Sequence, residues 1–428
     1  MTPELEVRLF GARVGWLSAV KGQLSFRYDS AWLSGAQARP LSVSLPLRAE
    51  PFEHTDARAY FAGLLPEGHM RELLARQFHV SKQNDYALLE QIGGECAGAV
   101  SLHMAEGDAV QASSANDVLW FSADSLAAAI DELPRRPLLA GTEGVRLSLA
   151  GAQEKFAVVV DHDRIGLPRG STPSTHLLKP AIRGFEGSVA NEAFCMSLAA
   201  TMALPTAAVG MREVQGRAYL LVARYDRVRD AAGSLTRLHQ EDFCQALGMA
   251  PELKYQNEGG PGLKDCFELV RRVTRPNAPS VLRLLDMVIF NALIGNHDAH
   301  AKNFSLLYRQ KLPELAPLYD CLSTAVYEQL TQKMAMKIGS KYLFNDLWPR
   351  HWEQLANACG LSPSQARKRV VALAATLPVV AQTLSTQIEQ GFADRSIVRR
   401  IVDLINARCA QTLRRMTMMS ASDPSVNG

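Results

Sequence analysis

The spacing of hydrophobic positions changes along the chain, and each change predicts a different kind of structure. Apolar and polar residues alternate over residues 5–28, with glycines at turn positions, which predicts a small antiparallel sheet. A further strand is expected at 41–47. Apolar positions then recur at helical spacing over 57–78, with a break at 65–68, and again over 85–92. The first part of the chain is therefore expected to combine a β meander with helices.

The middle of the chain alternates between short apolar runs and loops. Small polar residues at 106–117 are expected to separate an N-terminal domain from the rest of the chain. A short helix is predicted at 125–133, and an amphipathic helix at 191–199. Apolar runs typical of strands lie at residues 156–160, 174–180, 219–227 and 304–308.

The C-terminal part of the chain is largely helical. Helices are predicted at residues 240–247, 263–273, 280–294, 352–358, 364–377 and 393–416. This order predicts an α+β protein with an α/β lobe, a short hinge and a mostly α lobe, preceded by a small β-rich accessory domain. We place the accessory domain at 1–110, the first lobe at 118–223 and the helical lobe at 224–428.

The densest polar chemistry follows the apolar run 287–294. Gly295 is suited to the left-handed turn that ends a helix, and the loop after it contains Asp298 and Asn303. Asp320 follows seventeen residues later. Kinases use this order, in which a loop aspartate accepts the substrate hydroxyl proton while an asparagine and a later aspartate bind Mg²⁺. Oxygen-bearing side chains suit both tasks, although solvated polar groups at an ordinary helix end would look the same.

Upstream residues fit a phosphate-binding role. Lys179 lies near a strand end and Glu192 on the next helix, an arrangement in which kinases hold the lysine on the α- and β-phosphates. The alternative is a solvated lysine and a glutamate favoured by the helix dipole. The loop before the strand at 156–160 contains small residues, among them Ala150, Gly151 and Ala152, and ends in Lys155, so its backbone N–H groups could approach phosphate oxygens.

The strand at 219–227 ends in charged residues where a two-lobed kinase has its hinge. Backbone groups of Ala223, Arg224 and Tyr225 are expected to meet adenine. Asp226 is expected near the ribose.

Composition excludes several classes of protein. A chain of 428 residues with 47% hydrophobic and 21% charged residues is expected to form two or three globular units. A net charge of +3 is too small to indicate nucleic-acid binding by itself. Seven cysteines, widely spaced and never in a Cys-x-x-Cys pair, indicate neither disulfides nor a zinc site, so we expect buried thiols.

No apolar run is expected to reach the length that spans a bilayer. The alternating N-terminus, with Glu4 and Glu6, does not resemble a signal peptide. A cytoplasmic location is therefore predicted.

Together these segments resemble the HipA family, the serine/threonine kinase toxins of bacterial toxin–antitoxin modules. The resemblance covers nearly the whole chain. It is carried by LSLAGAQEK (147–155), THLLKP (175–180), NE (191–192), QEDF (240–243), GGPG (259–262), GNHDAHAKN (295–303) and LAPLYD (315–320), with LSFRY (24–28) and GLLPEG (63–68) in the accessory domain.

The resemblance implies a two-lobed protein-kinase-like fold and ATP- and Mg²⁺-dependent serine/threonine kinase activity, with Asp298 as proton acceptor and Asn303 and Asp320 as metal ligands. The implied nucleotide-contacting positions are Ala150, Gly151, Ala152, Gln153, Glu154, Lys155, Lys179, Ala223, Arg224, Tyr225, His300, Ala301, Lys302, Asn303, Tyr319 and Asp320. Ser148 falls on the family's regulatory autophosphorylation position. A phosphate there would repel nucleotide or displace the loop, and so inactivate the kinase.

Two positions depart from common patterns. Ala223 stands where the family often has a hinge glutamate, so adenine would have to be bound by main-chain groups. His300 follows Asp298 by two residues, where many protein kinases carry lysine and this family usually carries histidine.

The resemblance also implies partners. These are a HipB-like helix-turn-helix antitoxin, operator DNA bound with it, and an aminoacyl-tRNA synthetase as substrate, most often glutamyl-tRNA synthetase. Phosphorylation of the synthetase would stop translation and cause growth arrest and persistence. The cluster Arg367, Lys368 and Arg369 coincides with the family's DNA-contacting position, although charge alone would fit a solvated helix face.

Two other functions stay open at this point. His297 and Asp298 could be a metal-binding pair of a phosphohydrolase, although such a site needs further histidines and the nearest upstream one, His239, is distant in sequence. Alternatively, the chain could be a catalytically weak co-repressor scaffold on DNA.

Overall fold

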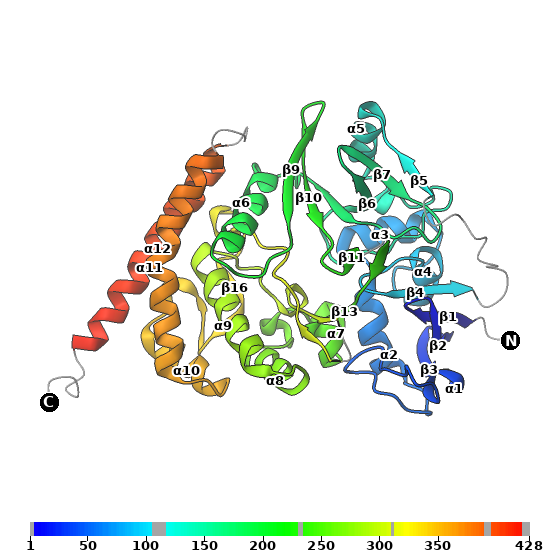
Figure 1. Ribbon diagram of the computed structural model, residues 1–428, viewed down its shortest axis with the longest axis horizontal. Helices are drawn as coiled ribbons and strands as arrows, with labels where there is room; N and C mark the ends of the chain where they lie inside the picture. Colours follow the sequence, from blue (N-terminus) through cyan, green and yellow to red (C-terminus); the bar gives the residue numbers. More distant parts are fainter. Residues whose placement is uncertain (1–3, 105–116, 230–233, 310–311, 389–394, 422–428) are drawn as a thin grey trace. The chain divides into compact units, whose positions relative to one another are not determined.

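The computed structural model describes residues 4–104, 117–229, 234–309, 312–388 and 395–421, so the boundary expected at 106–117 lies almost wholly outside the described residues. The chain forms two compact units, each built from three separate segments (Figure 1). Unit 1 comprises Met1–Ile182, Gly210–Glu252 and Ser305–Pro313, and unit 2 comprises Arg183–Val209, Leu253–Phe304 and Glu314–Gly428. The three consecutive domains proposed from the sequence remain a prediction.

Unit 1 begins with the predicted meander. Strands β1 (Glu4–Leu9), β2 (Ala12–Val20) and β3 (Gln23–Tyr28) pair antiparallel, and β4 (Val100–Met104) pairs with the other edge of β1. Every second residue of β1 is buried, as the alternating pattern requires. Gly11 and Gly22 have φ values of 81° and 78°, the left-handed conformation that these tight turns need.

Short helices accompany this sheet in unit 1. They are α1 (Ser30–Leu33), α2 (His54–Phe61), the 3₁₀ turn η1 (Ala62–Leu64), α3 (Gly68–Gln77) and α4 (Asp85–Ile92). The helical predictions for 57–78 and 85–92 are therefore confirmed, including the break at 65–68. The strand predicted at 41–47 is wrong, because this segment is a turn with an isolated bridge between Ser42 and Leu45.

A six-stranded sheet with the order β5-β7-β6-β8-β10-β9 forms another part of unit 1, and most of its strands are labelled in Figure 1. Its strands are β5 (Val118–Trp120), β6 (Phe156–Asp161), β7 (Arg164–Pro168), β8 (His176–Pro180), β9 (Val209–Val214) and β10 (Arg217–Ala223), accompanied by α5 (Ala123–Glu132) and η2 (Pro137–Leu139). The β8–β10 register places Lys179 opposite Leu220 and Ala223 opposite His176. Side chains from both sheets share one hydrophobic core, so the expected accessory domain and first lobe pack together.

Two further strand pairs complete unit 1. β11 (Arg227–Arg229) pairs with β12 (Leu235–Arg237), and β13 (His239–Asp242) pairs with β14 (Ser305–Tyr308). The side chain of Asp242 then caps α7 (Phe243–Leu247) by accepting from the backbone N of Gln245 at 2.9 Å. The helix predicted at 240–247 is thus wrong over its first three residues, which pair with β14.

Glu241, on β13, has a buried carboxyl group. Ser42 Oγ and Tyr308 Oη donate hydrogen bonds to it, and Val43 N donates at 3.1 Å. Burial raises its pKa to about 7, although these hydrogen bonds oppose the shift. The turn at 41–47 is therefore attached to β13 through a carboxyl group that titrates near neutrality.

The stability of the protein should depend on pH through Glu241. Because its pKa is about 7 in the folded state and near 4.5 in the unfolded state, the folded state holds the proton more tightly between these values. Glu241 should therefore make unfolding easier as pH rises from 4.5 to 7, by up to about 1.4 kcal/mol per pH unit. Glu241→Gln should remove this slope from urea-unfolding curves. The exposed Glu213→Gln should keep it, and a slope unchanged in Glu241→Gln would contradict the assignment.

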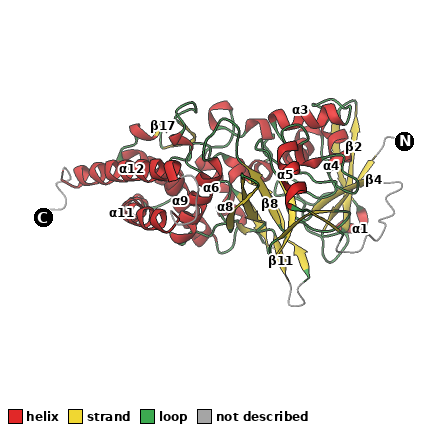
Figure 2. Cartoon of the chain, turned by 90° about the horizontal axis from the view of Figure 1, so that it is seen from above, coloured by secondary structure: helices red, strands yellow, loops and turns green. Residues whose placement is uncertain are grey.

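Unit 2 is mostly helical (Figure 2). Its helices are α6 (Ser188–Thr201), α8 (Leu263–Val273), α9 (Asn277–Ile294), α10 (Pro349–Ala358), α11 (Pro363–Ile388) and α12 (Arg395–Ala421). Short elements connect them, namely η4 (Gln256–Glu258), η5 (Ala301–Asn303), β15 (Glu314–Leu315), η6 (Thr324–Val326), β16 (Lys333–Ile338), β17 (Lys341–Leu343) and η7 (Phe344–Asp346). Within η3 (Pro251–Leu253), the chain passes from unit 1 to unit 2. α11 and α12 pack against each other, and both pack against α9.

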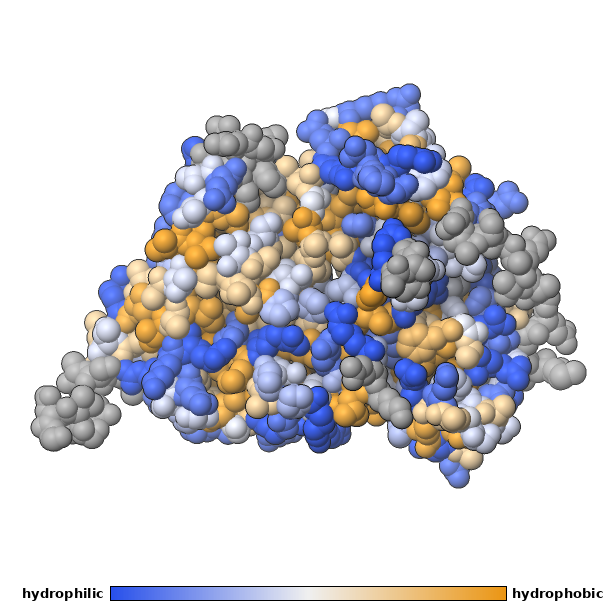
Figure 3. Space-filling model, viewed as in Figure 1, coloured by the Kyte–Doolittle hydropathy of each residue, from blue (hydrophilic) through white to orange (hydrophobic). Residues whose placement is uncertain are grey.

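Two helices are long and apolar enough to cross a membrane, namely Asn277–Ile294 and Pro363–Gln387. The expectation that no segment reaches this length is therefore wrong. Because 67% of the first segment is buried within the protein, it fits the core helix of a globular fold. Polar and apolar residues are mixed over the face of the molecule shown in Figure 3.

All seven cysteines are buried and free, as expected from their spacing. Burial raises the pKa of the thiols of Cys96, Cys195, Cys359 and Cys409 to about 12, although nearby arginines oppose the shift at Cys96, Cys359 and Cys409. These groups are therefore protonated at neutral pH and behave as small apolar side chains.

Candidate active site

Helix α9 ends at the polar loop that the sequence singled out. Gly295 has a φ of 79°, and a Cβ atom there would lie 2.7 Å from the Cβ of Ala325, so only glycine fits. The loop is then attached to the helix by two hydrogen bonds. Asn296 donates from its backbone N to Asn291 O and from its Nδ2 to Asn291 Oδ1, both at 2.9 Å.

Asp298 lies within this fixed loop. Its backbone N donates to Asn296 Oδ1 at 3.1 Å, and its backbone O accepts from Asn303 Nδ2 at 2.9 Å. The Asp298 side chain is 46% exposed, whereas that of His300, whose Nε2 lies 4.0 Å from Asp298 Oδ1, is 6% exposed. The loop therefore presents a solvent-accessible carboxylate on a constrained backbone, as a proton acceptor requires.

Asn303 and Asp320 offer oxygen atoms suited to a hard cation. The hydrogen bond from Asn303 Nδ2 to Asp298 O fixes the amide, so that its Oδ1 faces away from that carbonyl. Asp320 has a φ of 52°, a left-handed conformation that is uncommon outside glycine and often marks a functional site. Tyr319 Oη donates to Lys302 O at 2.6 Å, which ties the two segments together. This donor set fits Mg²⁺.

His297 is committed to structural contacts. Its Nε2 accepts from Arg408 Nη2 at 2.9 Å, and its Nδ1 contacts Thr331 O at 3.3 Å. Burial, followed by the nearby Arg408 charge, lowers the His297 pKa to about 4, so the ring is neutral. With Nδ1 as donor and Nε2 as acceptor, neither nitrogen has a lone pair left for a metal. Within the described residues, no group of three His, Cys, Asp or Glu side chains could hold a metal ion. These contacts argue against His297 as a metal ligand, a role on which the phosphohydrolase alternative depends.

Arg408, on α12, positions the loop through His297. Its Nη1 also donates to Ala292 O at 2.7 Å, near the C-terminus of α9, and its guanidinium lies 4.3 Å from the ring centre of Phe344. Arg408 thus joins α12, the end of α9 and the residue before Asp298.

Arg408→Met should keep much of the packing on Phe344 but remove the donor to His297. We expect the His297 pKa to rise above 4, because a neighbouring positive charge is lost while burial remains. Any phosphoryl transfer in which Asp298 accepts the proton should slow about tenfold, because the loop is less well positioned. NMR titration of the imidazole tests the first effect and steady-state kinetics the second. Arg414→Met, on an exposed position of the same helix, is the control. An unchanged His297 pKa would contradict this role.

In unit 1, the candidate phosphate loop and the residues just before it form hydrogen bonds with turns of the expected accessory domain. Ser148 is fully buried, donating from Oγ to Leu64 O at 2.7 Å and from its backbone N to Glu95 O at 2.8 Å. Gly151 O accepts from Glu67 N at 3.1 Å. Gly151 has a φ of 101°, and a Cβ atom there would lie 2.9 Å from Lys155 Nζ, so the lysine ammonium lies close over the loop backbone.

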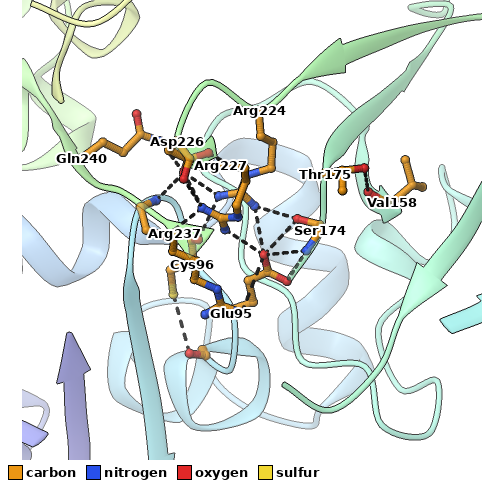
Figure 4. Close-up of polar contacts among 12 residues, drawn as sticks. Glu95, Cys96, Val158, Ser174, Thr175, Arg224, Asp226, Arg227, Arg237 and Gln240 are labelled. Atoms are coloured by element: carbon orange, nitrogen blue, oxygen red, sulfur yellow. Dashed lines mark hydrogen bonds and ion pairs between the residues drawn. The ribbon is translucent and has the colours of Figure 1, made fainter. Parts of the chain in front are cut away.

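The segment expected to bind adenine and ribose is joined to a buried ion cluster (Figure 4). Arg224 donates to both Asp226 oxygens, at 3.0 and 2.7 Å, and Arg227 Nη2 lies 2.8 Å from Glu95 Oε1. Ser174 Oγ donates to the same Glu95 oxygen at 2.9 Å. Asp226 is 2% exposed and also accepts from Gly98 N at 2.7 Å. Protein groups thus bind the Asp226 carboxylate, which argues against its expected place near the ribose.

The electrostatics of this cluster favour its charged state. Burial disfavours ionised Glu95, but the guanidinium groups of Arg237, Arg227 and Arg224 outweigh it and lower the Glu95 pKa to about 2. Burial likewise opposes ionisation of Asp226, and Arg224 and Arg227 lower its pKa. The cluster therefore fixes the segment after β10 to the turn before β4.

Two family models match this chain. The model described as the HipA N-terminal domain matches residues 5–103, and that described as the HipA-like C-terminal domain matches residues 147–381. The chain belongs to the HipA family. Relatives agree with this assignment. A Sinorhizobium fredii protein named "Putative kinase Y4mE" is 45% identical over 390 residues, covering 90% of this chain and 93% of that protein.

A second relative and a solved structure extend the comparison. The serine/threonine-protein kinase toxin HipA of Shewanella oneidensis is 27% identical, with 96% of each chain covered. The structure of Shewanella oneidensis MR-1 HipA with HipB and its operator DNA matches with a TM-score of 0.85 at 24% identity, covering 97% of this chain and 98% of that chain. The predicted α+β, protein-kinase-like fold is confirmed.

In this HipA-family chain, the predicted site residues are divided between the two units. Asp298, His300, Asn303 and Asp320 belong to unit 2, together with Ala301, Lys302 and Tyr319. The loop 150–155, Lys179 and 223–225 belong to unit 1. Lys179 is 4% exposed, so it is not the solvated lysine of the alternative interpretation, and Glu192, in unit 2, is also buried at 3% exposure. Their pairing remains a prediction.

The basic cluster on α11 is mostly engaged within unit 2. Arg369 forms an ion pair with Asp286, with Nε 2.6 Å from Oδ1, and Arg367 Nη2 donates to Met416 O at 2.7 Å. Lys368 is exposed. The electrostatic footprint expected for DNA contact is therefore smaller than the sequence suggested.

Sequence reasoning missed Glu95, Tyr255 and Arg408. Glu95 follows two glycines, a pattern typical of an ordinary turn, and its charge partners lie more than a hundred residues away. Arg408 is one of several arginines on α12, and no local pattern separates it from its exposed neighbours. Tyr255, whose Oη donates to Asp298 Oδ1 at 2.6 Å, precedes the glycine-rich turn at 259–262, which gave no chemical signal.

Proposed function

We propose that this HipA-family protein is an ATP- and Mg²⁺-dependent serine/threonine kinase that acts as the toxin of a toxin–antitoxin module. Kinase activity in general is supported by the names of its relatives, since one is a serine/threonine-protein kinase toxin and another is named as a kinase. The observation that carries the proposal is the constrained loop of unit 2, in which the Asp298 carboxylate is accessible and Asn303 is oriented beside it.

Asp298 would accept the proton of a serine or threonine hydroxyl. The hydroxyl oxygen then bonds to the γ-phosphorus of ATP while the bond from that phosphorus to the bridging oxygen of ADP breaks. Asn303 Oδ1 and the Asp320 carboxylate would hold Mg²⁺, which neutralises phosphate charge when bound. His300, Ala301, Lys302 and Tyr319 would contact nucleotide from the same unit.

Unit 1 would supply the phosphate-binding groups. Backbone N–H groups of Ala150, Gly151, Ala152, Gln153 and Glu154, with the Lys155 ammonium, would approach the phosphates. The Lys179 amine would bind the α- and β-phosphates, with Glu192 as its proposed partner. Main-chain groups of Ala223 and Tyr225 would meet adenine. The backbone N of Arg224 already donates to Thr175 O at 3.0 Å, so its part would fall to the carbonyl.

Phosphorylation of Ser148 would inactivate the protein. The Ser148 hydroxyl is fully buried and faces the carbonyl oxygen of Leu64. A phosphoserine carries about −1.5 to −2 charges and three acceptor oxygens, so a carbonyl neighbour would repel it. The modified residue could not return to this position, and the loop 150–155 would stay displaced.

The proposed partners follow the family. The structural relative is a complex of HipA, HipB and operator DNA, so we propose a HipB-like antitoxin and operator binding, with Lys368 as the accessible member of the basic cluster. We propose an aminoacyl-tRNA synthetase, glutamyl-tRNA synthetase first, as the substrate in the cytoplasm. Its phosphorylation would stop tRNA charging and arrest growth.

The test is to incubate the purified protein with γ-labelled ATP and a panel of aminoacyl-tRNA synthetases, with Mg²⁺ or with a chelator. We expect Mg²⁺-dependent label on one synthetase, with glutamyl-tRNA synthetase strongest, and on Ser148 by mass spectrometry. ATP binding by calorimetry without any transfer would instead support the co-repressor scaffold. Phosphate release without protein labelling would contradict the kinase proposal.

A further inference from the structure

A tyrosine hydroxyl is hydrogen-bonded to the carboxylate of Asp298, the proposed proton acceptor. Tyr255 Oη donates to Asp298 Oδ1 at 2.6 Å, and both residues belong to unit 2. A general base must lie about 2.6–3.2 Å from the proton that it accepts. The phenol therefore lies where the hydroxyl of a protein substrate would have to bind.

The loop around Tyr255 is built to hold the ring there. The backbone O of Tyr255 accepts from Glu258 N and Gly260 N, both at 3.0 Å. Gln256 Oε1 accepts from the backbone N of Lys337, on β16, at 2.7 Å. A Cβ atom on Gly260 would lie 2.1 Å from Leu253 O, so this tight turn excludes any side chain at that position.

Ring contacts further define the position. The Tyr255 ring packs edge-on against His300, with ring centres 5.1 Å apart and an angle of 80°. The ammonium of Lys254 lies 5.4 Å from the Tyr255 ring centre. Packing on His300 requires the aromatic ring but not its hydroxyl, so the hydroxyl has a separate effect, which is to bind Asp298.

We propose that the Tyr255 hydroxyl occupies the site beside Asp298 where the substrate hydroxyl binds. A serine or threonine hydroxyl must then displace the phenol before phosphoryl transfer. This inference rests on the proposed kinase function. Tyr255 is therefore a specificity-determining residue. An acceptor peptide that binds well around the loop displaces it, whereas a hydroxyl with few other contacts does not.

Competition of this kind has a kinetic signature. The substrate peptide binds only those protein molecules in which the phenol has released Asp298. The apparent affinity for the peptide therefore falls in proportion to the fraction of such molecules. A hydrogen bond to a charged group makes that fraction small. Removing the hydroxyl should lower the KM for the acceptor and leave the KM for ATP and kcat unchanged. If the phenol instead positioned Asp298 for catalysis, its removal would lower kcat.

The experiment compares the full-length protein with Tyr255→Phe, using a peptide of residues 144–155, which contains Ser148, as the acceptor. Tyr342→Phe is the matched control, because its ring lies 5.0 Å from the Lys337 ammonium in the same unit. Label from γ-labelled ATP is measured in the peptide and in the protein. Asp298→Asn gives the background.

Tyr255→Phe should lower the KM for the peptide about three- to tenfold, with Tyr342→Phe like wild type. Suppose that wild type labels the peptide. An unchanged or higher KM for the peptide in Tyr255→Phe, or a lower kcat, would then overturn the inference and leave the kinase function standing. Labelling no higher than in Asp298→Asn for every protein would overturn the kinase function, and the inference with it.

A second variant guards against a misfolded Tyr255→Phe protein. Gln256→Ala keeps the Tyr255 side chain but removes the hydrogen bond between its loop and β16, so the phenol should be held less firmly on Asp298 and the KM for the peptide should again fall. Thermal unfolding of each variant checks its fold. Should Gln256→Ala be folded and show a KM no lower than wild type, the loop does not restrain the phenol and the inference fails.

Discussion

Asp298→Ala should reduce labelling of Ser148 from γ-labelled ATP by about a thousandfold and should abolish growth arrest when the protein is expressed alone. The expected size follows from the contribution of a positioned general base, about 10²–10⁴-fold. Asp298 is the accessible carboxylate of a loop fixed by Asn296 and Asn303, so its removal should leave the fold intact.

Asp403→Ala is the control for this prediction. Asp403 is an exposed aspartate on α12 of the same unit, and its removal should leave labelling and growth arrest unchanged. Retained labelling in Asp298→Ala would remove Asp298 from its role. Equal unfolding midpoints for the two variants would show that loss of activity does not arise from loss of structure.

Glu95→Gln should lower the free energy of unfolding by about 3–5 kcal/mol. Glu95 is 3% exposed and lies among Arg224, Arg227 and Arg237. Neutralising it leaves Arg224 and Arg227 buried, with the carboxylate of Asp226 still paired to both. Breaking a buried ion pair by removing one partner has an effect of this size, because the remaining charge stays buried without compensation. Urea unfolding at pH 7 measures the loss.

Glu132→Gln is the matched control, because it neutralises a glutamate in an exposed pair with Arg136. A surface pair of this type contributes at most about 1 kcal/mol. A loss in Glu95→Gln no larger than in Glu132→Gln would contradict the buried cluster.

The pH dependence gives an independent check on Glu95. Its pKa is lowered to about 2 in the folded protein, so its contribution is complete above the unfolded value near 4.5 and is lost as pH falls toward 2. The difference in stability between wild type and Glu95→Gln should therefore shrink below pH 4.5. A difference that stays constant down to pH 3 would contradict the low pKa.

Features determined by neighbours in sequence could be predicted from the sequence. The end of α9 at Gly295, the full span of α4 and the span of α8 match their predictions because hydrophobic spacing, caps and glycines act locally. The order Asp298, Asn303 and Asp320 likewise indicated a candidate site whose first two members the structure joins by a hydrogen bond.

Features determined by distant partners could not be predicted. The segment 41–47 has the alternating pattern of a strand, but Ser42 and Val43 bind Glu241, about two hundred residues away. Residues 240–242 have helical spacing, but they pair with β14. Asp226 resembled a ligand-binding carboxylate at a strand end, although Arg224 and Arg227 neutralise it inside unit 1. Tertiary contacts override local pattern at each of these positions.

The same distinction applies to function. The sequence pointed to His297 as an alternative metal ligand, and its partner Arg408, on a helix about a hundred residues later, removes that role. Tyr255 Oη lies on Asp298 because η4 and β16 hold its loop, a relation that no spacing in the sequence reveals. Chemical roles that depend on a single distant contact therefore need coordinates.

The most direct measurement of the central claim is the mass of the intact wild-type protein after incubation with ATP and Mg²⁺, followed by mapping of the modified residue. The kinase account predicts the addition of one phosphate, located on Ser148, which disappears with a chelator and in Asp298→Ala. An unmodified mass after prolonged incubation, in a protein that calorimetry shows to bind ATP, would contradict it.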